Sequence, residues 1–274
     1  MNSYTIFLQV QPAVASDADG DFVVAWAEPR GAYDSGVFVQ RYASSGVPKG
    51  AAFQVTNYTT IDYTFPEVFA DSDGDFVVAW AGGYVEASYR AVRAKRYDSS
   101  GTEQFALVLP GAAEPAVSGE SNGDFVLVWS EETKIGYSAI FGQLYQSTGA
   151  LLGTEFHVSS DLGLRREYDP SVAADADGDF VVVWENRSNF ARNVLGRRFA
   201  SSGAPLGQDF PVSALTEGYE YAARVSSDPA GNFVVAWNDI IGDVGDFIRT
   251  RGFASDGAQR FPESPIAIGA MPCP

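Results

Sequence analysis

Acidic side chains recur in this sequence at a spacing that suits calcium. The phrase "DADGDFVVAW" places carboxylates at Asp17, Asp19 and Asp21, which are positions 1, 3 and 5 of the phrase. Oxygen ligands at positions 1, 3 and 5 are typical of the start of a calcium-binding loop. Two further copies carry the same three aspartates. The candidate calcium ligands are therefore Asp17, Asp19, Asp21, Asp71, Asp73, Asp75, Asp175, Asp177 and Asp179.

A tight hairpin turn explains the same phrase without a metal. An Asp-Gly pair between two apolar segments is a strong hairpin signal, because glycine takes the positive φ that such turns require. Each phrase runs directly into an apolar segment, so no acidic residue follows at the far end of a calcium loop. The sequence favours a structural turn with no cofactor and keeps Ca²⁺ as the alternative.

Side chains that could carry out catalysis are few. With one cysteine, Cys273, and one histidine, His157, the chain can form neither an internal disulfide nor a Cys/His zinc cluster. Two carboxylates could still hydrolyse a glycosidic bond. The catalytic candidates are Glu67, Glu114 and Asp169, which adjoin prolines at the start of short predicted strands. A non-catalytic protein is favoured over an enzyme.

The acidic phrase belongs to a repeat that fills most of the chain. The five tryptophans lie 54, 49, 55 and 53 residues apart, and an acidic residue stands nine places before each one. Each copy contains four short segments rich in valine and aromatic residues, bounded by Gly, Asp and Ser, which predicts four strands. The second strand ends at the tryptophan, and the third ends at an aromatic residue that precedes a turn such as "ASSG".

These strands predict an all-β fold, a single five-bladed β-propeller. The second strand is apolar on both faces, so neighbouring sheets must cover both of its sides, as they do when four-stranded antiparallel sheets pack radially. The expected blades are residues 11–56, 66–108, 115–159, 170–213 and 223–264. A strand at 7–10 is expected to close the ring beside the fifth blade, and 265–274 form a tail. A fragment of a longer array is the alternative.

Alternate connections of an antiparallel meander emerge at opposite ends. The acidic turns and the "ASSG" turns share one end, and loops that differ between copies share the other, where binding sites usually lie. Aromatic rings beside polar groups are typical of sugar recognition. The predicted ligand-binding residues are Arg30, Tyr33, Asp34, Tyr63, Tyr168, Glu185, Asn186 and Arg187.

The charge of the chain limits its partners. Lys and Arg number 18 and Asp and Glu number 35, for a net charge of −17. This excess of negative charge argues against nucleic acid and anionic membrane surfaces. No apolar run is long enough for a membrane helix, and no leader peptide is evident at the start. The expected partners are glycans or another surface protein.

The phrases "DADGDFVVVWE" and "RRFASSGAPLGQDFPVS" resemble repeats of large secreted or surface proteins of bacteria. They are similar in character to the FG-GAP and Asp-box propeller repeats, although the Phe-Gly pair and the Ser-x-Asp-x-Gly-x-Thr-Trp order are missing. By architecture the chain resembles five-bladed lectins of the tachylectin type and some glycoside hydrolases. The resemblance implies an extracellular location and a lectin-like binding module, with an adhesive scaffold or a glycoside hydrolase as alternatives.

Overall fold

The structure is a computed structural model that describes residues 8–31, 34–56, 64–82, 90–134, 136–160, 165–187, 192–213, 219–241 and 245–268. In these residues every regular element is a β-strand, which confirms the predicted all-β class. None of the described segments is a helix of the length and apolar character needed to cross a membrane. The chain divides into two compact units, Met1–Trp129 with Leu144–Leu152, and Ser130–Gln143 with Gly153–Pro274.

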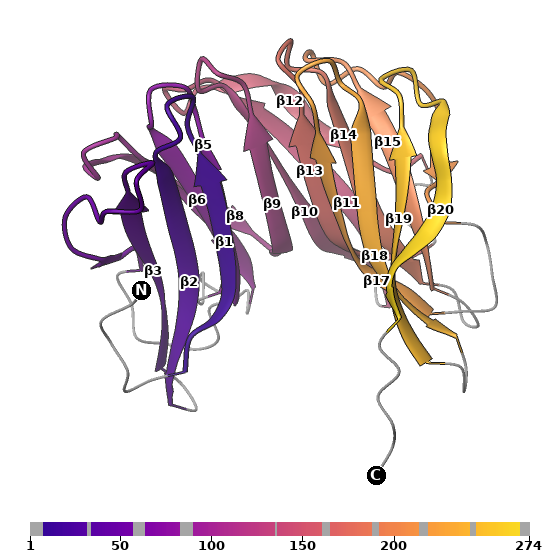
Figure 1. The fold of residues 1–274 in the computed structure, drawn as a ribbon, viewed down its shortest axis with the longest axis horizontal. Coiled ribbons are helices and arrows are strands. Elements are labelled where there is room, and N and C mark those ends of the chain that lie inside the picture. Colours follow the sequence, from indigo (N-terminus) through magenta and orange to yellow (C-terminus); the bar gives the residue numbers. More distant parts are fainter. Residues whose placement is uncertain are drawn as a thin grey trace. The chain divides into compact units, whose positions relative to one another are not determined.

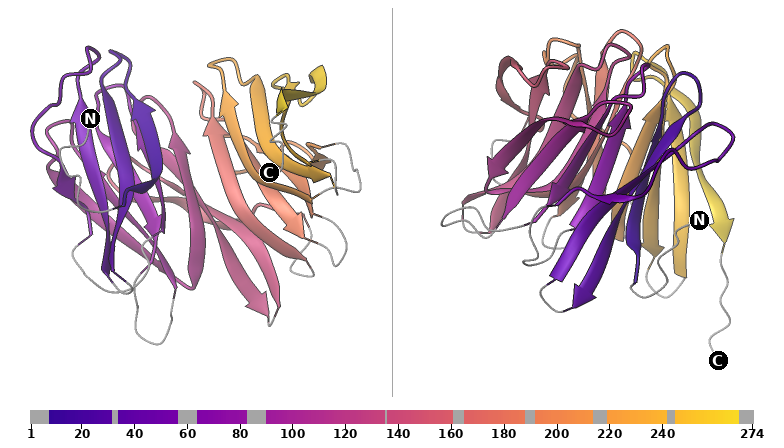
Figure 2. Two further views of the ribbon diagram at one scale, coloured as in Figure 1. Left: turned by 60° about the horizontal axis from the view of Figure 1, so that its bottom comes forward. Right: turned by 90° about the vertical axis from the view of Figure 1, so that its left-hand side faces the viewer.

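The strands form consecutive four-stranded antiparallel meanders (Figures 1 and 2). The first contains β1 (Val10–Ser16), β2 (Phe22–Gly31), β3 (Asp34–Tyr42) and β4 (Phe53–Gln54). The second contains β5 (Thr64–Ala70), β6 (Phe76–Ala81), β7 (Ala91–Tyr97) and β8 (Glu103–Pro110). The third contains β9 (Ala112–Gly119), β10 (Phe125–Lys134), β11 (Tyr137–Tyr145) and β12 (Leu151–His157).

The fourth and fifth meanders lie in the second unit. The fourth contains β13 (Arg166–Ala174), β14 (Phe180–Arg187), β15 (Arg192–Phe199) and β16 (Phe210–Pro211). The fifth contains β17 (Tyr219–Ser227), β18 (Phe233–Ile241), β19 (Gly245–Phe253) and β20 (Gln259–Ile268). The last three meanders are joined into one 12-stranded sheet, and the first two are separate four-stranded sheets. Among the described residues, the parallel pairs Ser138 with Arg166 and Arg192 with Tyr219 link these last three meanders.

One aromatic pair recurs in every meander and explains why the third strand ends in an aromatic residue. The phenylalanine that begins the second strand stacks on that residue, with ring centroids 4.9–5.2 Å apart. The two residues are also register partners, as for Phe180 and Phe199. Stacked rings of this kind add to the stability that apolar burial gives the hairpin.

Neighbouring sheets pack through complementary faces. Val23 and Ala25 of β2 lie in one buried cluster with Phe76, Val78 and Trp80 of β6. The fourth and fifth meanders repeat this arrangement with Val181, Val183, Phe233, Val235 and Trp237. All five tryptophans are at most 9% exposed, which confirms that they belong to the core.

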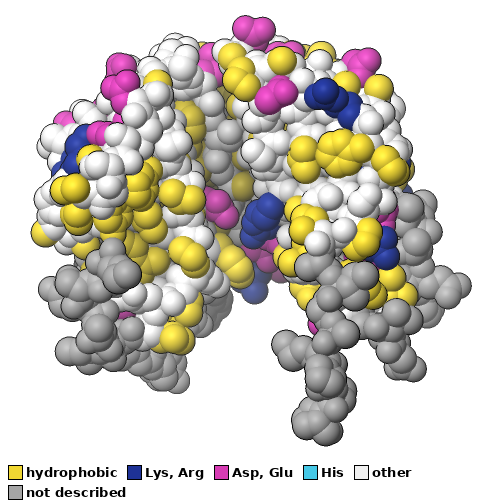
Figure 3. Space-filling view, in the orientation of Figure 1, with side chains coloured by type: hydrophobic (Ala, Val, Ile, Leu, Met, Phe, Trp, Pro, Cys, Tyr) yellow, Lys and Arg dark blue, Asp and Glu magenta, His cyan; other side chains and the backbone are white. Residues whose placement is uncertain are grey.

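The second strand is not buried on both faces in every meander. All residues of β14 except the last are buried, whereas β18 alternates and Val234 is 42% exposed. Ile248 and Phe261 are also exposed, and Figure 3 shows apolar side chains over β19 and β20. Within the described residues of the second unit, the Val234 face of β18 is therefore exposed, unlike the corresponding face of β14.

Of the described residues in the predicted closing strand at 7–10, only Val10 lies in an observed strand. Val10 pairs with Ala27 and so belongs to β1 of the first meander, and Phe7 lies outside the described residues. The fifth meander has its own fourth strand, because β20 runs through Pro265 to Ile268. An edge strand tolerates proline, since its outward side has no partner that needs an N–H donor. Ring closure stays a prediction.

Candidate functional site

The acidic turns hold themselves together with their first carboxylate. Asp71 Oδ1 accepts hydrogen bonds from the backbone N–H groups of Asp73 and Asp75 at 3.1 and 3.0 Å. Asp175 and Asp228 make the same pair of bonds to the second and fourth residues after them. The glycine of each turn has a φ between 77° and 86°, which only glycine adopts readily.

The third acidic residue of the phrase holds the neighbouring turn of the same sheet. Asp21 Oδ1 accepts a hydrogen bond from the backbone N–H of Ser44 at 2.9 Å. Asp75, Asp124 and Asp179 bond Ser99, Ser147 and Ser201 in the same way, at 2.8–2.9 Å. In these four meanders the bonds confirm that the acidic turn and the "ASSG"-type turn lie at the same end.

The nine candidate calcium ligands do not converge on a metal site in the described residues. No group of three or more His, Cys, Asp or Glu side chains is placed there to hold an ion. The first and third aspartates bond backbone amides, and the middle ones, Asp19, Asp73 and Asp177, are exposed. The fit to calcium is therefore poor, and the geometry supports the structural turn.

Calcium removal should consequently leave the fold unchanged. We expect the same melting temperature in EDTA as in millimolar calcium, because an ion that the folded state does not bind adds no stability. Differential scanning calorimetry would measure this. If the melting temperature instead falls in EDTA and recovers when calcium is added, the hypothesis that these nine residues bind calcium would be supported.

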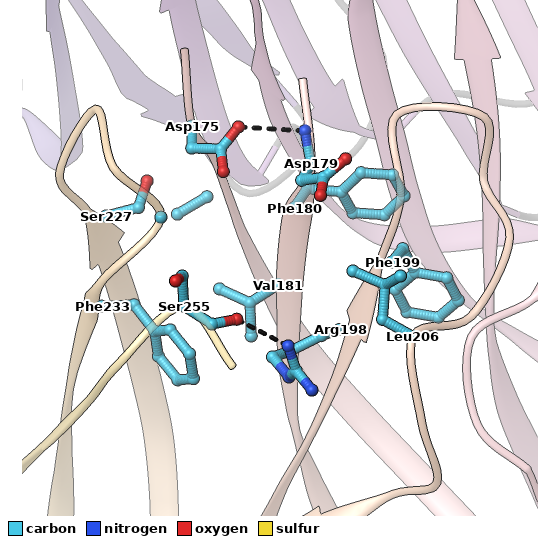
Figure 4. Close-up of a pocket in the computed structure, with 12 residues that line it drawn as sticks. Asp175, Asp179, Phe180, Val181, Arg198, Phe199, Leu206, Ser227, Phe233 and Ser255 are labelled. Carbon is cyan, nitrogen blue, oxygen red and sulfur yellow. Dashed lines mark hydrogen bonds between the residues drawn. The ribbon is translucent and has the colours of Figure 1, made fainter. Parts of the chain in front are cut away.

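Small cavities lie between adjacent sheets at the end that carries the acidic turns. One, of about 50 Å³, is lined by Asp175, Asp179, Arg198, Phe180 and Ser255 among others (Figure 4). Its counterpart between the first two sheets, about 20 Å³, is lined by the equivalent Asp17, Asp21, Arg41, Phe22 and Ser99. Volumes of this size hold a few water molecules. Their repetition reflects the packing of the repeat.

Arginines near the end of the third strand join neighbouring sheets beside these cavities. Arg41 and Arg198 donate to the carbonyl oxygens of Ser99 and Ser255 in the next meander. Arg96 is more deeply placed: it ion-pairs with Asp71 and donates to the Gly123 carbonyl at 3.1 Å. Both side chains of the Arg96–Asp71 pair are 5% exposed. The charged groups at this end of the sheets therefore stabilise the packing of neighbouring meanders.

Two buried glutamates occupy equivalent positions in the fourth and fifth meanders. The pKa of Glu220 is raised to about 7, chiefly by burial; the Ser213 hydroxyl opposes this rise, and the nearby Asp239 carboxylate adds to it. Burial likewise raises the pKa of Glu167 to about 7. Both carboxyl groups are at most 1% exposed. They are too deeply buried to contact a substrate, and they make the stability of this unit depend on pH.

The catalytic candidates Glu67, Glu114 and Asp169 each lie on the first strand of their meander, in β5, β9 and β13. Glu114 and Asp169 take a positive φ of 51° and 50°, as do Gln11, Phe65 and Ala222 at the same position of the other repeats. Non-glycine residues adopt this conformation rarely, and such residues cluster at functional sites. Asp169 ion-pairs with Arg224 at 3.2 Å. Glu67 pairs with Ala79 in the β5–β6 ladder.

Three predicted ligand-binding residues come together at the loop end of the fourth meander. The guanidinium of Arg187 lies 4.4 Å from the centroid of the Tyr168 ring. It also bonds both carboxylate oxygens of Glu185, at 2.7 and 3.0 Å. Arg192 approaches the same carboxylate at 3.5 Å and lies 5.7 Å from the centroid of the Tyr219 ring. We call these five residues the loop-end cluster.

The loop-end cluster is accessible to a ligand. Tyr219 is 51% exposed, and the side chains of Arg187 and Arg192 are 36% and 39% exposed, whereas Glu185 is buried beneath them. Arg192 and Tyr219 were not among the predicted site residues. The β14–β15 hairpin places Arg192 opposite Arg187, and this register depends on a loop length that the sequence does not reveal.

The remaining predicted ligand-binding residues lie elsewhere or cannot be placed. Asn186 is buried, is the register partner of Glu167, and lies on the opposite face of β14 from Glu185 and Arg187, so it is not part of the loop-end cluster. Tyr33 and Tyr63 lie outside the described residues, as do the side chains of Arg30 and Asp34.

Comparisons with solved structures identify the fold class. No protein-family model and no curated protein matches the sequence. A protein of unknown function from Dyadobacter fermentans has a TM-score of 0.68 at 13% identity, over 95% of this chain and 83% of its own. An α-L-arabinanase from Penicillium chrysogenum, solved with arabinobiose, has a TM-score of 0.58 at 12% identity, over 93% of each chain.

A second enzyme gives a similar result. The α-L-arabinofuranosidase of Fusarium graminearum, also solved with arabinobiose, has a TM-score of 0.60 at 11% identity, over 90% of this chain and 82% of its own. These neighbours are β-propeller glycoside hydrolases, and the similarity extends to propellers in general rather than to FG-GAP or Asp-box proteins. At such identities the likeness establishes the β-propeller type of fold alone.

Proposed function

We propose that this protein is a carbohydrate-recognising β-propeller that binds sugars at its loop-end cluster without hydrolysing them. The observation that carries the proposal is the pairing of two tyrosine rings with two arginines and a carboxylate on one exposed surface. An aromatic ring stacks on the C–H face of a sugar, and guanidinium groups donate to its oxygens. The exposed ring of Tyr219 offers the stacking platform.

Removal of the Tyr219 ring should weaken sugar binding. Tyr219→Ala is expected to lower affinity about tenfold, because an aromatic contact contributes roughly 1 kcal/mol beyond the area it buries. Affinity is measured by isothermal titration calorimetry with the best ligand from a plant and bacterial glycan array. Phe261→Ala, which removes another exposed aromatic ring of the same unit, is the matched control and should leave affinity unchanged.

Two other outcomes would replace this proposal. If no glycan on the array binds, the adhesive or structural scaffold is the better account. If both variants bind as the unaltered protein does, the sugar lies away from the loop-end cluster.

A glycoside hydrolase is the second candidate. Two of the structural neighbours, an arabinanase and an arabinofuranosidase, favour it. The test is whether the protein releases reducing sugar from arabinan. If it does, and Asp169→Asn abolishes this activity, the protein is a hydrolase and the non-catalytic proposal is wrong. Arabinan left intact by the unaltered protein would support binding alone.

We also propose that the five meanders form one five-bladed ring outside the cell. The Val234 face of β18 and the face of β2 that carries Phe22, Val24 and Trp26 have the residue types that pack together between the other sheets. In the proposed ring these two faces pack against each other, as the corresponding faces of other neighbouring meanders do. Class averages from electron microscopy that show a ring without five blades would disprove it, and resistance to protease added to intact cells would argue against the extracellular location.

A further inference from the structure

Three arginines stand side by side across the fourth meander at its loop end. Arg166 of β13 is the register partner of Arg187 of β14, and Arg187 is the register partner of Arg192 of β15. Directly opposed residues in antiparallel strands project from the same face of the sheet. The row continues through the parallel pair of Arg192 with Tyr219. We call Arg166, Arg187 and Arg192 the arginine row.

Fold stability does not account for the arginine row. Like charges directly opposite one another destabilise a sheet, and Arg187 has an arginine on each side. The chain has only 18 basic residues against 35 acidic ones, yet three of the 18 occupy this one row. Glu185 ion-pairs with Arg187 and Arg192. The three arginines and Glu185 together carry a net charge of +2.

The row presents its donors outward. Arg166 is exposed and its Nε donates to the Gly136 carbonyl at 2.8 Å, which fixes its direction. Glu185 accepts hydrogen bonds from two of the five N–H donors of Arg187, whose guanidinium lies over the Tyr168 ring, 4.4 Å from its centroid. Guanidinium groups fixed in this way are well suited to bind a carboxylate or sulfate through paired hydrogen bonds.

We propose that the arginine row binds the anionic group of an acidic polysaccharide whose neighbouring sugar stacks on Tyr219. This inference rests on the proposed carbohydrate-binding function and specifies its substrate class. The anion adds negative charge beyond that of Glu185, the carboxylate that contacts the row among the described residues, and the tyrosine supplies the apolar platform. The strongly acidic remainder of the surface repels a polyanion, so binding is confined to this row.

Three polymers distinguish the possible anions. Polygalacturonate carries carboxylates, carboxyl-reduced polygalacturonate is its neutral equivalent, and a sulfated galactan carries sulfates. We expect affinity electrophoresis to show retardation by a charged polymer and none by the neutral one, with retardation that weakens as salt rises from about 50 to 500 mM. The charged polymer that retards the protein identifies the group.

Arg166→Ala tests the row itself and leaves the ion pairs of Glu185 with Arg187 and Arg192 in place. We expect it to weaken binding of the charged polymer at least tenfold without lowering the melting temperature. Arg260→Ala, which removes an exposed arginine of β20, is the matched control and should bind normally.

Equal loss in both arginine variants would show a nonspecific charge effect and overturn the inference. If neutral arabinan binds through Tyr219 while neither charged polymer binds, the inference fails and the carbohydrate-binding function stands. If no polymer binds at all, both fail.

Discussion

Replacing Arg96 with alanine should lower the free energy of unfolding by about 3–5 kcal/mol, the usual cost of removing one partner of a buried ion pair. The variant leaves the Asp71 carboxylate buried without its guanidinium, and it also removes the bond to the Gly123 carbonyl of the next sheet. The measurement is urea denaturation followed by the fluorescence of the buried tryptophans.

Arg41→Ala is the matched control for Arg96. Arg41 holds the equivalent position in the first meander, but its bond to the Ser99 carbonyl is exposed, so we expect a loss of about 1 kcal/mol or less. A small and equal loss in the two variants would show that the Arg96–Asp71 pair contributes no more than an ordinary surface contact.

The second large expected effect is a dependence of the free energy of unfolding on pH, caused by Glu220. Glu220 has a folded-state pKa of about 7 against an ordinary value of 4.5. Between these values the folded state keeps a proton that the unfolded state releases. The contribution of Glu220 is therefore greatest below pH 4.5 and is lost as pH rises towards 7. The loss is about 3 kcal/mol, since each pH unit corresponds to about 1.4 kcal/mol.

Glu220→Gln should remove this loss. Glutamine has the shape of the protonated side chain, so we expect the variant to be more stable than the unaltered protein by about 2–3 kcal/mol at pH 8, with a small difference at pH 4.5. Glu132→Gln, at an exposed position of the same unit, should show no such dependence. A Glu220→Gln variant that is no more stable at pH 8 would mean that folding does not raise the pKa of Glu220.

Much of the fold could be predicted because the same pattern of strands and turns occurs in five copies of the repeat. The tryptophan spacing, the Asp-Gly turns and the apolar second strands identify four-stranded meanders without any knowledge of distant contacts. Gly20 and its equivalents were recognisable because a tight turn requires positive φ. By contrast, the left-handed residues of the first strand, such as Gln11 and Phe65, have no sequence signal.

The candidate site was only partly predictable, for reasons of register. Tyr168, Glu185 and Arg187 could be selected as polar and aromatic residues near loops. Their association with Arg192 and Tyr219 depends on which residues face one another across β14, β15 and β17. A shift of one residue would send these side chains to the other face of the sheet. The same dependence explains why Asn186, although next to Glu185 in sequence, lies apart from the loop-end cluster.

The two ends of the sheets therefore have different roles. At one end carboxylates bond backbone amides of short turns, and arginines join sheet to sheet, as the Asp175 and Arg198 contacts show in Figure 4. At the other end of the second unit, Tyr219 and the arginine row are exposed and carry an excess of positive charge. The second end is therefore the one we assign to ligand binding.

A crystal structure with a bound oligosaccharide tests this assignment most directly. The account predicts a sugar ring stacked on Tyr219, with its oxygens or its anionic group within hydrogen-bond distance of Arg166, Arg187 or Arg192. A sugar seated instead on the acidic turns at Asp175 and Asp179, at the opposite end of the sheet, would contradict it.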